Sequence, residues 1–420
     1  MRFSMYAPVL AAGVLAASGA AADTVRFATY NASLNRDTDG ALKADLESGA
    51  SQQASAVAEV IQHLGADVLL INEFDYAPGN DRLFADNYLA KPQNVSGQGT
   101  ATGVDYGYSF IAPSNTGLQT GFDMDGDGGI TGNDAHGFGL FEGQYGMTVY
   151  SRHEILTDQV RTFQTFRWTD MPDANLPTKD DGSSYYPSES LETLRLSSKS
   201  HWDIPIRIGD QVVHLLASHP TPPTFDGPED RNGRRNADEI RFWADYISGA
   251  EYIYDDKGVT GGLAEDAQFV IMGDQNADPH DGDSFRNAIL QLLEHERVNA
   301  TFTPRSKGGE AAAAQGGAND SHTGDPAEDT ADFADTAPGN LRADYVLPSR
   351  GLTVTGSGVF WPAGDDPLSV LTGEYPFPTS DHRPVWVDLD IPAPAPIPVP
   401  AAGLLLVSGL AGLVLARRRR

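Results

Sequence analysis

The feature that most constrains the fold of this chain is a series of short apolar segments, each of which ends at a polar residue. Such segments predict buried strands, because they are too short for ordinary helices and are bounded by turn-forming residues. The segments and the residues that follow them are 24–30 before Asn31, 68–71 before Glu73, 212–217 before His219 and 269–272 before Asp274. We expect the strand ends, and the polar residues with them, to gather along one rim of the fold.

Other segments supply the remaining elements of one α/β domain over residues 23–390. Residues 51–64 have apolar residues at helical spacing, and residues 236–247 predict an amphipathic helix. Residues 306–340 are rich in Gly, Ala and Asp without periodicity, which predicts a long acidic surface loop. Further strands are predicted at 145–150, 204–208, 345–347 and 385–389. These elements predict two layers of sheet with helices outside.

The N-terminal end has the composition of a targeting segment. Residues 1–22 combine the early Arg2, an apolar stretch over residues 7–17 and the small-residue exit Ala20–Ala22. This pattern predicts a signal peptide that is cleaved after Ala22, and export through the Sec machinery.

The C-terminal end predicts a membrane-directed tail. A Pro-rich linker at 391–400 precedes an apolar run at 401–416 and the arginines of 417–420. Val399-Pro400-Ala401 with this helix and tail resembles the VPLPA-type branch of PEP-CTERM sorting signals. The resemblance implies transit to the inner membrane, removal of residues 401–420 by a sorting enzyme, and release to the cell surface or outside. A plain anchor facing the periplasm is the alternative.

The charge balance limits the partners of this protein. The net charge is −29, and it becomes more negative if the basic ends are removed. Such a surface repels polyanions unless cations intervene, which argues against a large basic nucleic-acid footprint. The chain has no cysteine, so disulfides and zinc–thiolate sites are excluded.

The polar residues at the strand ends fit metal-assisted attack of water on a phosphate ester. Glu73 offers Mg²⁺ a carboxylate, and Asp274 can orient a water molecule. Asp344 can fix the imidazole tautomer of His382, which follows the potential metal ligand Asp381. Each of these residues alone suits a turn, a surface charge or a structural hydrogen bond equally well. The combination is what indicates phosphoester hydrolysis.

The whole set resembles the endonuclease/exonuclease/phosphatase superfamily, which includes DNase I, exonuclease III-type repair nucleases, inositol polyphosphate 5-phosphatases and neutral sphingomyelinases. For residues 23–390 the resemblance implies a four-layered α/β sandwich, in which helices cover two packed, mostly antiparallel sheets. It also implies hydrolysis that depends on Mg²⁺ or Mn²⁺.

The resemblance also assigns roles to single residues. The metal ligands are Glu73, Asn31 and Asp381, and the catalytic residues are His219, Asp274, Asn276, Asp344 and His382. His219 and Asn276 contact the phosphate, whereas Gln275 stands where an apolar residue is usual. Water is activated either by the His382–Asp344 pair or by Asp274, and the sequence leaves both open.

Three further residues are weaker candidates for substrate contact. Gln144 lies where the superfamily places a segment that supports the catalytic histidine. Arg231 and Arg235 belong to the basic cluster of this acidic chain. A contact with substrate phosphate and a salt-bridged helix face fit these arginines equally well.

Residues 123–134 follow the spacing of an EF-hand calcium loop. Position 12 is an aspartate instead of the usual glutamate, and no good helix flanks the loop. The pattern predicts an isolated Ca²⁺ loop of the extracellular type, and a solvated acidic turn is the alternative. The expected ligands are Asp123, Asp125, Asp127, Gly129, Thr131 and Asp134.

The function expected from the sequence is therefore an exported, metal-dependent phosphodiesterase or nuclease. A phosphatase, a sphingomyelinase-like phospholipase and a binding module that has lost activity are the alternatives. No essential polar residue of the set is missing, which favours an enzyme.

Overall fold

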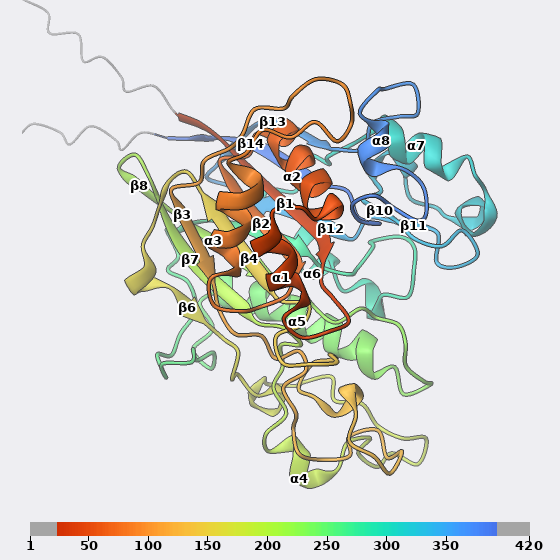
Figure 1. Ribbon diagram of the computed structural model, residues 1–420. Helices are drawn as coiled ribbons and strands as arrows, with labels where there is room; N and C mark the ends of the chain where they lie inside the picture. Colours follow the sequence, from red (N-terminus) through yellow and green to blue (C-terminus); the bar gives the residue numbers. More distant parts are fainter. Residues whose placement is uncertain (1–22, 393–420) are drawn as a thin grey trace, which may run out of the picture.

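Two sheets packed face to face form the centre of the computed structural model, which describes residues 23–392 (Figure 1). The first sheet has six strands in the order β13 (Thr353–Val359), β14 (Val385–Ile391), β1 (Asp23–Leu34), β2 (Val68–Phe74), β4 (Met147–Ser151) and β3 (Tyr108–Ile111). The second has the order β12 (Asp344–Pro348), β9 (Gln268–Asp274), β8 (Gln211–Ser218), β7 (His201–Ile208) and β5 (Glu154–Ile155), and β6 (Arg161–Thr162) also pairs with β7. Most neighbours are antiparallel, whereas β1–β2 and β8–β9 are parallel.

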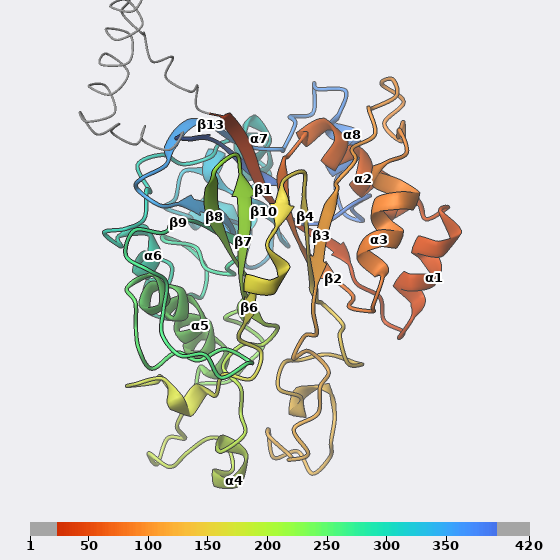
Figure 2. The same ribbon diagram turned by 90° about the vertical axis from the view of Figure 1, so that its left-hand side faces the viewer.

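Alternating side chains bury both faces of the sheets. In β1, Val25 and Phe27 point into the core between the sheets, while Ala28 and Tyr30 face the outer helices. Figure 2 shows helices α1 (Ala41–Ser48), α2 (Gln52–Leu64) and α3 (Asn80–Phe84) outside the first sheet. Helices α5 (Arg231–Ile247) and α6 (Leu290–Leu293) lie outside the second. The expected α/β sandwich with two sheets and outer helices is confirmed.

Element boundaries differ from the expectations where the backbone turns sharply. The strand expected at 145–150 begins at Met147, because Tyr145 has φ 56° and Gly143 has φ 90°. Helix α5 begins at Arg231 instead of residue 236, directly after Asp230, whose φ is 53°. The basic cluster therefore lies in the first turns of this helix.

The expectation of a long loop at residues 306–340 is wrong. This segment contains helix α7 (Lys307–Ala313) and the paired strands β10 (Ala331–Asp332) and β11 (Asn340–Leu341). The Ser306 hydroxyl accepts a hydrogen bond from the Gly309 amide at 3.0 Å and caps α7. Gly308 packs its backbone against the Trp361 ring, where any side chain would collide. Because small residues pack through their backbone, this segment has no apolar periodicity from which its helix and strands could be predicted.

The expected targeting segments cannot be placed in this fold. Residues 1–22 and the tail at 401–420 lie outside the described residues, as does the Pro-rich linker from residue 393 onward. Within residues 23–392, none of the helices combines the length and apolar character that crossing a membrane requires.

Candidate active site

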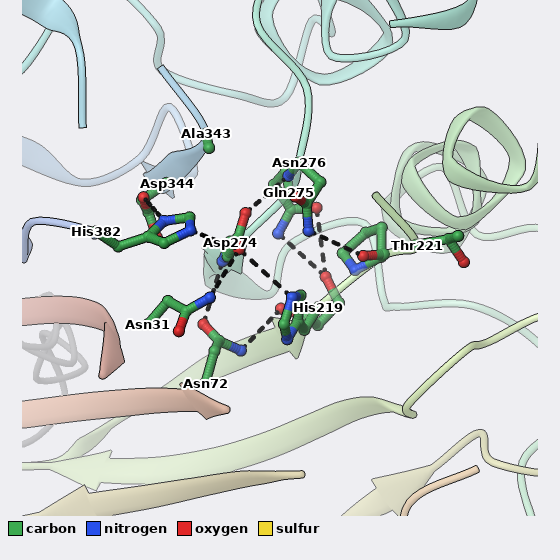
Figure 3. Close-up of polar contacts among 12 residues, drawn as sticks. Asn31, Asn72, His219, Thr221, Asp274, Gln275, Asn276, Ala343, Asp344 and His382 are labelled. Carbon is green, nitrogen blue, oxygen red and sulfur yellow. Dashed lines mark hydrogen bonds and ion pairs between the residues drawn. The ribbon is translucent and has the colours of Figure 1, made fainter. Parts of the chain in front are cut away.

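Strand topology brings expected polar residues to one rim of the sandwich. Those that Figure 3 labels include Asn31, His219, Asp274, Asp344 and His382. Parallel pairing of β1 with β2 and of β8 with β9 aligns the ends that carry Asn31, Glu73 and Asp274, with His219 directly after β8. Strand β12 runs antiparallel to β9, so its first residue, Asp344, lies opposite Asp274. Strand β14 runs antiparallel to β1 and begins at the same rim, three residues after His382.

Asp274 is the centre of this group. Its Oδ2 accepts a hydrogen bond from Asn31 Nδ2 at 3.0 Å. The Nε2 atoms of His219 and His382 lie 3.4 Å and 3.6 Å from the same oxygen. Burial opposes ionisation, but His382, His219 and Asn31 outweigh it and hold the pKa of Asp274 well below its ordinary value. Asp274 is therefore a buried carboxylate that stays charged.

His382 lies between carboxylates. Its Nδ1 lies 2.8 Å from Asp344 Oδ2, and its Nε2 faces Asp274. Asp344 Oδ2 also accepts a hydrogen bond from the Thr330 hydroxyl at 2.9 Å. Burial alone would lower the pKa of His382, but Asp344 and Asp274 raise it well above its ordinary value. The surroundings thus favour the imidazolium form.

His219 has the opposite surroundings. It is 3% exposed, and its Nδ1 has no hydrogen-bond partner within residues 23–392. Burial, followed by the charge of nearby Lys199, lowers its pKa to about 4. Its ring is therefore neutral near pH 7 although it faces the same carboxylate as His382.

Glu73 and Asn31 fit a divalent ion. Glu73 is partly exposed, has φ 57° and lies beside Asn31. Burial raises the pKa of Glu73, so a cation at this carboxylate would relieve the cost of its charge. Asp381 is also partly exposed and acts electrostatically on Glu73. The Asp274, Asp344 and His382 ligand atoms lie within 4.8 Å of one another.

The turn after β9 has little freedom. Gly273 has φ 145°, and a Cβ there would collide with the Ser218 carbonyl. The Asn276 amide N–H donates to Asp274 Oδ1 at 2.9 Å, and its side chain donates to Pro220 O at 3.2 Å. Gln275 is also held in place, because its side-chain amide donates to the Ser218 hydroxyl at 3.1 Å.

Buried polar residues that the sequence analysis missed support this turn. Asn72 accepts from the Asp274 amide at 3.1 Å. Asn236 donates to Gln275 O at 2.9 Å, and Glu239 accepts from the Ser198 and Thr221 amides, both at 2.6 Å. Asn236 and Glu239 are fully buried on α5. Polar residues on the buried face of an amphipathic helix are the signal that could have revealed them.

The weaker candidates lie in other contacts. Gln144 is buried and bonds Arg36 O and the Leu140 amide, both at 2.7 Å. Arg235 is buried and donates to Leu196 O, to Arg195 O and to His136 O. Arg231 pairs with Glu229 and lies over the Tyr185 ring. Their contacts hold loops together, and a substrate role for them stays a prediction.

The 123–134 loop brings part of its expected ligand set together. Ligand atoms of Asp123, Asp125 and Asp134 lie within 4.8 Å of one another. Asp134 is fully buried and accepts from the Met124 and Thr131 amides, both at 2.6 Å. Asp127 stands apart from this group and accepts from the Gly129 amide at 2.7 Å.

Comparisons with known proteins agree with this arrangement. The model of the Endonuclease/Exonuclease/phosphatase family matches residues 28–382. No curated protein sequence matches the chain.

Three of the solved structures that are similar to this chain carry different names. An endonuclease/exonuclease/phosphatase from Beutenbergia cavernae is 16% identical, with 88% of this chain and 72% of that chain covered and a TM-score of 0.47. Sphingomyelinase C from Streptomyces griseocarneus is 15% identical, with 87% and 99% covered and a TM-score of 0.45. Truncated TDP2 from Caenorhabditis elegans is 13% identical, with 88% and 98% covered and a TM-score of 0.38.

Proposed function

Because this chain belongs to the endonuclease/exonuclease/phosphatase family and is a metal-dependent hydrolase of phosphoester bonds, we propose that it is a phosphodiesterase, with nucleic acid as the first substrate class to test. The observation that carries this proposal is the pair of histidines in opposite environments on the same carboxylate, Asp274. Diester hydrolysis requires one group that accepts a proton from water and another that protonates the leaving alkoxide.

The charges of the rim favour a diester over a monoester. Glu73, Asp274, Asp344 and Asp381 are all carboxyl groups, whereas the basic side chains whose charges act on them include Lys199 and Arg383. A diester phosphoryl group carries one negative charge, whereas a monoester carries close to two near neutral pH. The monoanion therefore meets less repulsion in this site.

Glu73, Asn31 and Asp381 are the residues that would hold Mg²⁺ or Mn²⁺. The ion, when bound, polarises the phosphoryl oxygen and offsets charge that develops on it.

The side chains of this protein supply proton transfer and orientation. Asp274 is charged and rigidly held, so it orients the attacking water and accepts the proton that the water gives up. His382, placed between Asp344 and Asp274, is the proton donor to the leaving alkoxide. His219 contacts the phosphoryl group as a neutral ring.

The test compares three substrates with purified protein in Mg²⁺, in Mn²⁺ and in EDTA. We expect turnover of bis-p-nitrophenyl phosphate and plasmid DNA, little turnover of p-nitrophenyl phosphate, and loss of all activity in EDTA or in Asp274→Asn. Turnover of the diester without DNA cleavage would direct the search to phospholipid diesters. Turnover of the monoester alone would overturn the phosphodiesterase proposal.

We also propose that the 123–134 loop binds Ca²⁺. The proximity of Asp123, Asp125 and Asp134 supports this assignment. Added Ca²⁺ is expected to raise the Tm of the protein, and the double variant Asp123→Ala/Asp125→Ala is expected to lose this increase. An equal Ca²⁺ effect in the variant would contradict the site.

We propose further that residues 1–22 direct Sec-dependent export and that residues 401–420 direct sorting at the inner membrane. The composition of both ends supports this proposal. Mass spectrometry of protein recovered from the cell surface and medium is expected to show Asp23 as the first residue and a truncated C-terminus. Intact chains confined to the cytoplasm would contradict it.

A further inference from the structure

Lys199 is a buried cation that the proposed chemistry has not yet used. Its side chain is 7% exposed, and within residues 23–392 no carboxylate forms an ion pair with its ammonium. Burying an ammonium group without a partner costs several kcal/mol. Burial lowers the pKa of Lys199, and an anion placed beside the ammonium would relieve the cost of its charge.

The backbone around Lys199 places it beside His219. Two residues later, His201 pairs with Ser218 in the β7–β8 ladder. The hydroxyl of the preceding residue, Ser198, donates to the His219 carbonyl at 3.4 Å. The Lys199 carbonyl accepts from the Asn115 amide at 2.8 Å, which fixes the segment from the other side.

The charge of Lys199 acts on the rim of the candidate active site. The carboxylates that act on its ammonium are Glu239, then Glu73 and Asp274. Lys199 in turn is the main charge that lowers the pKa of His219. The ammonium is therefore within electrostatic range of Glu73, Asp274 and His219.

A purely structural role as the counter-ion of Glu239 is the alternative. The Glu239 carboxylate, however, already accepts the Ser198 and Thr221 amides, both at 2.6 Å, with one bond to each oxygen. Both oxygens are satisfied, and Lys199 lies beyond ion-pair distance of them. The Glu239 carboxylate consequently does not account for the position of this lysine.

We propose that Lys199 binds a non-bridging oxygen of the substrate phosphoryl group on the His219 side of Asp274. This inference rests on the proposed phosphoesterase function. A phosphoryl anion would supply the ion-pair partner that the described residues do not, and Lys199 keeps 7% of its surface exposed. An ammonium held in a buried site stabilises negative charge as it grows on the oxygens during attack.

The test measures kcat and KM for bis-p-nitrophenyl phosphate at saturating Mg²⁺. Lys199→Met is expected to lower kcat/KM by about 10²–10³-fold, as removal of a single anion-stabilising donor does. Lys199→Arg is expected to recover part of this loss because it keeps the charge. Lys179→Met, at an exposed position, is the matched control and is expected to behave as wild type.

A second readout separates substrate contact from structural support. Inorganic phosphate is expected to inhibit wild type competitively and Lys199→Met about tenfold more weakly, with equal Tm values. If Lys199→Met is unstable, Lys199→Ala is assayed with and without ethylammonium, which is expected to restore turnover. Wild-type kcat/KM and phosphate inhibition in Lys199→Met, or a loss of Tm with unchanged kinetics, would overturn the proposal. Absence of turnover in wild type would instead refute the proposed function itself.

Discussion

The two sides of Asp274 carry the same residue type in opposite states. On one side, His382 contacts Asp344 Oδ2 at 2.8 Å, and the Thr330 hydroxyl from the 306–340 segment donates to the same oxygen. On the other side, His219 Nδ1 has no hydrogen-bond partner within residues 23–392, and the charge of Lys199 acts on the ring. Carboxylates raise the pKa of one ring, whereas burial and a cation lower the pKa of the other. The acid–base role of each histidine is therefore determined by the charged groups around its ring, since the residue type is the same on both sides.

The largest effect is expected from removing the charged histidine. His382→Ala is expected to lower kcat for a phosphodiester by about 10³-fold, because it removes the proton donor to the leaving group. His219→Ala is expected to lower kcat less, since a neutral phosphate contact is lost. Steady-state kinetics on bis-p-nitrophenyl phosphate check this order. Equal losses of kcat in both variants would contradict the different roles assigned to the two histidines.

A smaller effect on activity is expected from the support of His382. Thr330→Val keeps the shape of the side chain but removes the hydroxyl that bonds Asp344 and accepts the Ala343 amide. We expect kcat to fall about tenfold, together with a stability loss of about 1–3 kcal/mol. Urea unfolding measures the stability. Thr355→Val, in an exposed position, serves as the control.

Glu239, which supports the His219 side, is expected to affect stability more than chemistry. Glu239→Gln replaces an acceptor by a donor, so either the Ser198 or the Thr221 amide loses its partner. Leaving one buried amide unsatisfied costs about 1–3 kcal/mol. We therefore expect a lower Tm with kcat within about threefold of wild type. A large fall in kcat at unchanged Tm would contradict this difference between the sides.

The smallest effect on activity is expected at Asp329, the neighbour of Thr330, which instead makes stability depend on pH. Burial, with Asp278 and Asp281, raises the pKa of Asp329 from 3.8 to about 8. The folded protein therefore holds this proton more tightly than the unfolded chain, and the contribution of Asp329 to stability falls as pH rises from 3.8 to about 8. Asp329→Asn removes this dependence. Its Tm advantage over wild type is expected to grow across that range, and a constant difference would contradict the assignment.

The site residues that directly follow regular strands could be predicted from the sequence. Asn31, Glu73 and Asp274 follow apolar runs, and strand pairing alone determines that they meet. His382 and Asp344 could be paired because the set of polar residues to which they belong resembles that of a known family.

The residues that surround the histidines could not be predicted in the same way. Lys199 lies in an irregular segment, where no periodicity indicates burial. Thr330 belongs to a segment of small residues that packs through its backbone. In the sequence, Glu239 looks like any solvated helix residue. Its burial follows from the face of α5 that packs inward, and tertiary packing determines that face.

The central claim, that one histidine beside Asp274 is charged and the other is neutral, can be measured directly by ¹⁵N NMR of histidine-labelled protein in EDTA. His219→Ala and His382→Ala assign the two rings. At pH 7 we expect an imidazolium for His382 and a neutral ring for His219. Titration of both rings together near the ordinary histidine value of about 6.5 would contradict the account.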